Sequence, residues 1–186
     1  AFVAAVGTEG HRAINIDING WRGAEPAPVT YVGQGVAGGG TVFNGINADS
    51  TAGDDNLTIG GTNLLDSIGD PTTVTFTLTP VAGENLSATA SPSLKSNLFA
   101  DFAAVGFQGQ FTGTSDFIIS SLGEVPTVDL YFYFREDPLS DGAFAGSTYT
   151  IAGADAFPFT AHGIFNDGNT VYIKNVPVVN GQVSGV

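Results

Sequence analysis

The side chains that could do chemistry are mostly carboxylates, because the 186 residues include 18 Asp and Glu but only two His and no Cys. Hydrolysis by paired carboxylates requires two acids that face each other across a cleft, about 5–9.5 Å apart. The Glu residues instead lie in turn-like contexts, such as Ala24-Glu25-Pro26 and Gly123-Glu124-Val125. These contexts indicate solvated loop carboxylates, so we expect no catalytic acid pair.

Nucleophilic and zinc chemistry are also disfavoured by the residue types. His11 and His162 are the two histidines, and neither belongs to a His-x-His or His-Glu-x-x-His pattern. No Gly-x-Ser-x-Gly elbow is present. Without cysteine there is no thiol nucleophile, no disulfide and no cysteine-ligated metal. We therefore predict no catalytic residues and a protein that is not an enzyme.

Calcium is the ion that the sequence favours most. Asp49, Asp54 and Asp55 cluster in one segment, and carboxylate oxygens suit Ca²⁺. Asp66 and Asp70 could add ligands if that loop folds back. The EF-hand pattern is not met, and a solvated acidic loop without any metal is the competing interpretation. No other cofactor is expected.

A sugar-binding face is the second candidate site. Such faces combine exposed aromatic rings with amide or carboxylate groups, and Trp21, Tyr31, Phe43 and Asn44 could form one. Trp21 directly follows Asn19-Gly20, a pair typical of tight turns, and this would place it at a rim. The competing interpretation is that the single Trp packs in the core or at an edge.

Charge and hydropathy limit the partners. The formal net charge of −13, with only five Lys and Arg, disfavours nucleic acid and anionic lipid surfaces. No apolar run approaches the roughly 18 residues that a membrane helix needs, so membrane insertion is not expected. The chain begins at Ala1 with no signal peptide, which favours a processed mature product over a trimmed chain.

The elements that must position these residues follow a period of two. Ile14, Ile16 and Ile18 alternate with polar residues, which predicts a half-buried strand with a polar outer face. The run 128–134 is apolar or aromatic on both faces and predicts a central strand. Turn signals recur about every 8–15 residues. The fold class predicted is all-β, a single jelly-roll-like β-sandwich with at most one short helix.

One segment has helical spacing. Leu94, Leu98, Phe102 and Val105 recur at three or four residues, and this predicts a short helix or helical turn near 93–104.

The first residues stand apart from this alternation. Residues 1–12 are expected to form an apolar arm, and residues 13–186 the β-sandwich domain. The arm could close the chain's own sheet as an edge strand, or fill a groove on a neighbouring subunit by strand addition. Its assembly residues in the second case would be Phe2, Val3, Ala4, Ala5 and Val6.

The order of motifs resembles secreted β-sandwich proteins that carry PEP-CTERM sorting tails in Gram-negative bacteria. The resemblance covers roughly residues 13–186, and the tail itself is not part of this sequence. It implies export, with a place in the extracellular matrix or on the cell surface. Members of this group are mostly uncharacterised, so the resemblance implies no active-site residues. The matching pieces are 14–19, 31–35, 40–45, 64–69, 74–78, 129–133 and 148–153.

Three functions follow as hypotheses. The first is a non-enzymatic extracellular structural protein, whose partners are other copies of itself in a filament, sheath or matrix. Its arm would make a head-to-tail contact that need not close, and removing residues 1–10 is expected to leave a folded monomer that no longer assembles. The second is a secreted carbohydrate-binding module for extracellular polysaccharide. The third, a polysaccharide-cleaving enzyme, is disfavoured by the residues present.

Overall fold

The computed structural model describes twelve stretches of the chain, and all structural statements concern these. They are residues 2–6, 13–21, 30, 41–49, 58–81, 85–90, 101–106, 114–133, 147–149, 151, 159–161 and 170–186. Their regular structure consists of strands, with no helix. The strands are β1 (Phe2–Val6), β2 (Ala13–Trp21), β3 (Asn44–Asp49), β4 (Ile59–Gly61), β5 (Thr75–Pro80), β6 (Asn85–Ala90), β7 (Asp101–Gly106), β8 (Ser115–Ser120), β9 (Thr127–Tyr133), β10 (Ser147–Tyr149), β11 (Phe159–Ala161), β12 (Thr170–Pro177) and β13 (Val183–Gly185).

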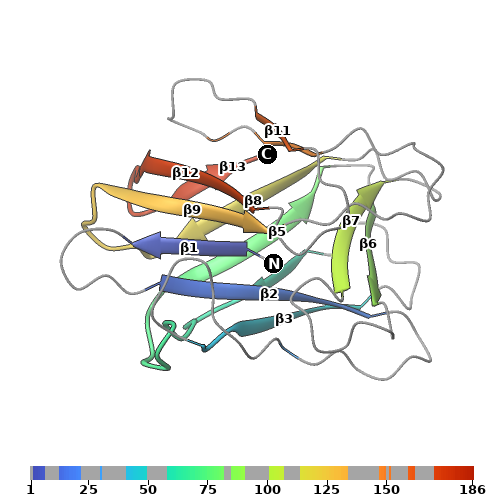
Figure 1. The fold of residues 1–186 in the computed structure, drawn as a ribbon, viewed down its shortest axis with the longest axis horizontal. Coiled ribbons are helices and arrows are strands. Elements are labelled where there is room, and N and C mark those ends of the chain that lie inside the picture. The colour runs from blue at the N-terminus through green and yellow to red at the C-terminus, as the bar shows by residue number, and fades with distance from the viewer. Residues whose placement is uncertain are drawn as a thin grey trace.

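Two sheets form the layers of a sandwich (Figure 1). The first is five-stranded, in the order β12-β9-β1-β2-β3, and the second is four-stranded, in the order β13-β8-β5-β4. Pairing is antiparallel except between β2 and β3, which run parallel. Two further pairs, β6-β7 and β10-β11, form separate two-stranded sheets. The predicted all-β sandwich is confirmed.

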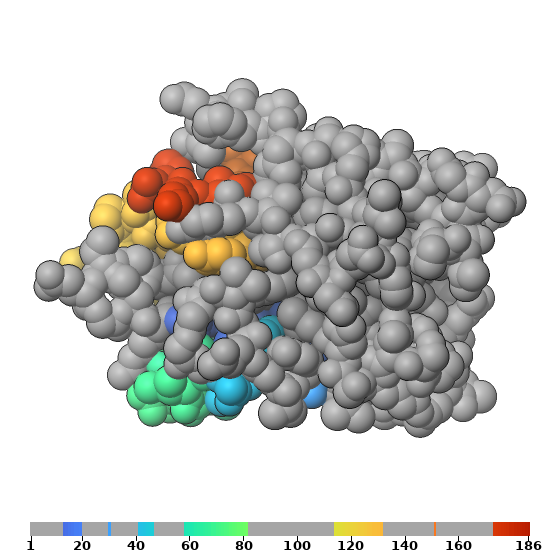
Figure 2. Space-filling view, in the orientation of Figure 1, coloured from blue at the N-terminus to red at the C-terminus, as the bar shows by residue number. Residues whose placement is uncertain are grey.

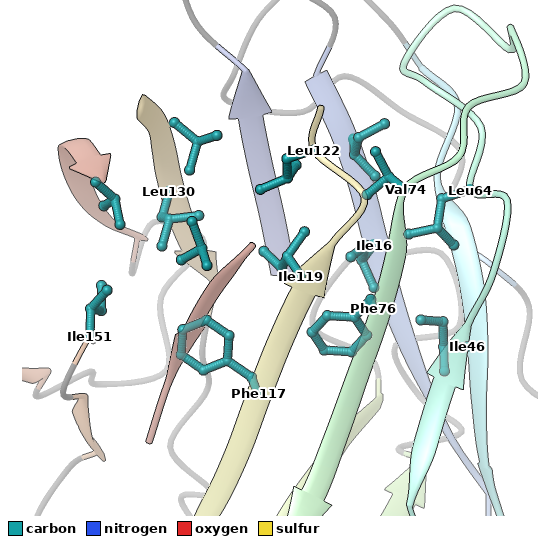
Figure 3. Close-up of a cluster of buried hydrophobic side chains, with 14 of the residues drawn as sticks. Ile16, Ile46, Leu64, Val74, Phe76, Phe117, Ile119, Leu122, Leu130 and Ile151 are labelled. Atoms are coloured by element: carbon teal, nitrogen blue, oxygen red, sulfur yellow. The ribbon is translucent and has the colours of Figure 1, made fainter. Parts of the chain in front are cut away.

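The core lies between these sheets because each contributes one apolar face. The five-stranded sheet supplies Ile14, Ile16 and Leu130, and the four-stranded sheet supplies Phe76 and Ile119, all of them at most 1% exposed. Figure 3 shows Ile16 and Leu130 from the first sheet lying close to Phe76 and Ile119 from the second. The alternation in β2 and β5 thus predicts the residues that face the core.

Two local predictions are wrong. Residues 101–104, expected to end a helix, belong to β7, which pairs with β6 from Asp101↔Ala90 to Gly106↔Asn85. Residues 91–100 lie outside the described stretches. Asn19-Gly20 forms no turn, because the parallel ladder with β3 continues through Gly20↔Ala48 to Trp21↔Asp49. In both places strand pairing overrides a local sequence signal.

The outer face of β2 is also different from the prediction. Asn15, Asp17 and Asn19 were expected to be solvated, yet they are only 1%, 2% and 3% exposed. β6 and β7 lie against this strand, and they cross near its end in Figure 1. Strand β2 is therefore buried on both faces, one apolar and one polar.

A tight turn at 66–70 joins the two layers. The buried Asp66 accepts hydrogen bonds at Oδ1 from the backbone N–H of Ile68 (3.1 Å) and of Asp70 (2.8 Å). Gly69 has a φ of +97°, which favours glycine. The backbone N–H of Ser67 donates to the carbonyl of Ala13 at 2.8 Å. The turn is thus attached to the first residue of β2.

Replacing Asp66 should destabilise the fold measurably. Asp66→Ala removes the acceptor of two backbone N–H groups, and we expect a loss of about 1–3 kcal/mol in the free energy of unfolding. Urea denaturation followed by circular dichroism measures it. Glu124→Ala, in an exposed turn, is the matched control and should change stability by less than about 0.5 kcal/mol. Equal effects of the two substitutions would contradict this role of Asp66.

Candidate functional site: the terminal strand and its slot

The apolar arm forms β1, in the interior of the five-stranded sheet. It lies between β2 and β9 and runs antiparallel to both (Figure 1). The structure therefore places the arm in the chain's own sheet, as one of the two alternatives predicted. It corrects that alternative in one respect, because β1 is a central strand and not an edge strand. We call the space between β2 and β9 the slot.

The register of β1 sets it opposite the most buried residues of its neighbours. Phe2 is the Cα partner of Ile16, and Ala4 is the partner of Ile14 on one side and of Leu130 on the other. Val6 pairs with Val128. These four partners, on β2 and β9, are at most 1% exposed. The walls of the slot are thus part of the core.

The slot needs a strand for two physical reasons. Without β1, the backbone N–H and C=O groups that β2 and β9 direct into the slot would lose their partners, and unpaired polar groups next to a core are costly. The five-stranded sheet would also separate into β12-β9 and β2-β3. The arrangement can therefore hold an extended apolar peptide, which is the recognition mode called strand addition.

Of the residues proposed for a glycan face, the structure describes the side chains of Phe43 and Asn44. Phe43 is 7% exposed and lacks the open ring face that stacking requires, which is a correction for this residue. Trp21 ends β2, and Tyr31 lies outside the described residues. The Phe43 ring belongs to the buried hydrophobic residues.

Asn44 is occupied within the chain, which corrects its assignment as a sugar contact. Its Nδ2 donates to the carbonyls of Asn15 (2.9 Å) and Leu65 (2.8 Å), and its Oδ1 accepts from the N–H of Leu65 (2.8 Å). Asn44 thus bridges β2 to the segment that precedes the 66–70 turn. Figure 2 shows residues 41–46 (light blue) beside residues 58–81 (green) at one corner of the molecule.

The proposed calcium ligands fall largely outside the described residues. Asp54 and Asp55 are not described, and Asp49 is the last residue of β3, paired with Trp21. Asp66 holds its own turn through Oδ1. Within the described part of the chain, no three His, Cys, Asp or Glu side chains gather as a metal site would require.

Four residues considered for catalysis are Glu25, Glu124, His11 and His162, and the structure describes one of them, Glu124. Glu124 is exposed in a turn, as expected for a solvated carboxylate. Glu25, His11 and His162 lie outside the described residues. Among the residues that the structure describes, no helix is long and apolar enough to cross a membrane.

Sequence reasoning missed two features of this region. The buried polar face of β2 looks like any solvated strand face, because alternation does not say what covers it. The hydrogen bonds of Asn44 have one weak sign in the sequence, because Asn44 precedes Gly45 in the strand-and-turn segment 40–45.

No protein family, no curated protein and no solved structure matches this chain.

Removing the arm should disrupt the fold, which revises the expectation of a folded monomer after truncation. A chain without residues 1–6 lacks the strand between β2 and β9, and we expect it to lose its cooperative thermal transition. A synthetic peptide of residues 1–6, added in excess, should restore that transition. Circular dichroism during heating measures both effects.

A peptide with Ala4→Asp is the matched control for this experiment. It places a carboxylate at the register position opposite Ile14 and Leu130, and it should not restore the transition because an unpaired buried charge is costly. A truncated chain with an unchanged transition would show that the slot needs no strand.

Proposed function

We propose that this chain is a non-enzymatic extracellular structural protein, the subunit of a filament, sheath or matrix, assembled by exchange of β1 between subunits. The observation that carries the proposal is the position of β1. It is the first of the described strands in chain order, and both of its edges are paired, next to the most buried residues of β2 and β9. The same fit is available to the β1 of another copy.

The connection between β1 and β2 is long enough for such an exchange. Seven residue steps separate Val6 from Ala13, and an extended chain covers at most about 3.3–3.6 Å per residue. The connection can therefore span about 23–25 Å, roughly the thickness of a sandwich with its side chains. Exchanging β1 head to tail gives a heterologous contact, which produces a fibre when it does not close.

The net charge favours this kind of contact over broad surface association. Each subunit carries −13, and two such surfaces repel each other at low ionic strength. An inserted strand concentrates backbone hydrogen bonds and apolar contacts in a small area. Without cysteine, a durable assembly must rest on contacts of this kind.

Edge-to-edge addition is disfavoured at β12, an outer strand of the same sheet. Its ladder with β9 shifts register between Ile173 and Val176, and the exposed Lys174 and Asn175 lie in this irregularity. The Asn175 N–H donates to Oδ1 of Asp129 at 2.8 Å. Bulges and lysines at edges are devices that prevent strand addition. The slot is therefore a better route to assembly than the β12 edge.

Exchange competes with β1 of the same chain. A tethered strand has an effective concentration in the millimolar range, so the closed monomer should dominate in dilute solution. Assembly is then expected to depend on protein concentration and on release of β1. The proposed place of assembly, outside a Gram-negative cell, is supported by the resemblance to secreted sandwich proteins and by the low charged fraction of 12%.

A secreted carbohydrate-binding module remains the alternative. Two of its four proposed contact residues, Phe43 and Asn44, are buried or engaged in the chain, so it would depend on Trp21 and Tyr31. We favour assembly for this reason.

Introduced cysteines can distinguish exchanged from closed β1, because the chain has no cysteine of its own. Ala5 and Ala13 are Cα partners, and partners in an antiparallel pair are close enough for a disulfide. The variant Ala5→Cys/Ala13→Cys, oxidised after assembly at high concentration, should give a ladder of covalent oligomers on non-reducing gels. Oxidised in dilute solution, it should give monomers.

The matched control joins two strands that do not exchange. Thr75 and Ser120 are Cα partners on β5 and β8, so Thr75→Cys/Ser120→Cys should give monomers under both conditions. If the Ala5/Ala13 variant forms fibres by electron microscopy but gives only monomers on gels, β1 is not exchanged and the proposal is wrong.

A further inference from the structure

The chain contains three Asn-Gly pairs, Asn19-Gly20, Asn44-Gly45 and Asn180-Gly181. In such a pair the backbone nitrogen of the glycine can attack Cγ of the asparagine, because glycine has no side chain to obstruct the approach. The attack forms a bond between this nitrogen and Cγ, breaks the Cγ–Nδ2 bond and releases ammonia, which leaves a succinimide ring. Water then opens the ring to aspartate or isoaspartate. The surroundings of each pair decide whether this deamidation can proceed.

Asn19-Gly20 is protected by burial and by strand pairing. The Asn19 side chain is only 3% exposed. Its Nδ2, the atom that would leave as ammonia, donates to Thr30 Oγ1 at 3.2 Å. The parallel ladder between β2 and β3 continues through Gly20↔Ala48. The glycine nitrogen therefore cannot turn toward Cγ of Asn19 unless these two strands separate.

Asn44-Gly45 is protected by the hydrogen bonds of its side-chain amide. Nδ2 of Asn44 donates to the carbonyls of Asn15 and Leu65, and its Oδ1 accepts from the N–H of Leu65. Gly45 lies in the β2–β3 ladder as the Cα partner of Asp17. Closure of the ring would break three side-chain hydrogen bonds and disturb this ladder.

Asn180-Gly181 lies in an exposed turn instead. Asn180 has a φ of +53° and Gly181 a φ of +73°, and a positive φ at both central residues defines a type I′ turn. Two hydrogen bonds between Val179 and Gln182, of 2.9 and 3.1 Å, close the turn. The two central residues themselves belong to no ladder, and Asn180 is exposed. Water therefore reaches its amide, and the backbone can rearrange without separating two strands.

This turn also links the two layers of the sandwich, because β12 belongs to the five-stranded sheet and β13 to the four-stranded sheet. The N–H of Val178 donates to the carbonyl of Pro126 at 3.0 Å, and the carbonyl of Gly181 accepts from the N–H of Leu122 at 3.0 Å. Leu122 and Pro126 lie in the connection between β8 and β9, which joins the same two sheets. Two connections between the layers are thus bonded to each other at this point.

We propose that Asn180 is a deamidation site, which water converts to isoaspartate and aspartate without an enzyme, and that isoaspartate weakens this link between the sheets. Isoaspartate adds one carbon atom to the backbone of a two-residue turn, so the hydrogen bonds between Val179 and Gln182 lose their geometry. Each conversion also replaces a neutral amide by a carboxylate. The site does not depend on the proposed assembly.

Mass spectrometry of tryptic peptides tests the site, because the positions of Lys and Arg put the three pairs in separate peptides, 13–22, 23–95 and 175–186. In folded protein at mildly alkaline pH, Asn180 should convert at least about tenfold faster than Asn19 or Asn44. Those two react only after local opening, and a tenfold ratio corresponds to an opening free energy of about 1.4 kcal/mol. In guanidinium chloride, which removes this protection, the three pairs should convert at comparable rates.

Two variants at position 180 separate the chemistry from its consequence. Asn180→Gln needs a larger, less favourable ring, and it should abolish conversion at this position. Freshly prepared Asn180→Asp carries the new charge on an ordinary backbone. The isoaspartate form, separated from aged protein by ion exchange, should therefore have a thermal midpoint at least about 2 °C below that of Asn180→Asp.

Three outcomes would overturn the proposal. In the first, Asn180 of the folded protein converts no faster than Asn19 or Asn44. In the second, Asn180 converts in guanidinium chloride but not in the folded protein, which would show that the turn protects it. In the third, the isoaspartate form and Asn180→Asp have the same thermal midpoint, so that the added backbone atom leaves the link between the sheets intact.

Discussion

The pairing of β1 with both β2 and β9 is the constraint on which the five-stranded sheet depends. β2 and β9 are separated by more than one hundred residues of sequence, and in the described part of the sheet β1 alone lies between them. Their buried residues Ile16 and Leu130 face the other sheet across the core. Loss of β1 from this position would divide the sheet into β12-β9 and β2-β3.

Strand β2 imposes a second constraint on the fold, because both of its faces are buried and each needs suitable partners. The apolar face is satisfied by core packing. The polar face requires hydrogen-bond partners or ligands, and these come from elements distant in sequence, such as Val42 and Thr30. Asn44 binds the backbone of β2 to that of Leu65. These contacts hold in place the strand against which β1 pairs.

The sequence predicted what depends on alternation and missed what depends on pairing. Ile14, Ile16 and Phe76 were assigned to the core correctly because a strand has a period of two. The central position of β9 followed from an apolar run on both faces. The burial of Asn15, the failure of the Asn19-Gly20 turn and the strand at 101–106 all result from partners far along the chain. Local propensity contains no information about these partners.

Strand exchange by itself gains little free energy, because the pairs broken in the closed chain are the pairs formed between subunits. Whether the free energy of assembly is favourable then depends on two smaller contributions. These are the new contacts between neighbouring subunits and the repulsion between chains that each carry a net charge of −13. Because dissolved ions screen the repulsion between the subunits, assembly by strand exchange would respond to the ionic strength of the surroundings.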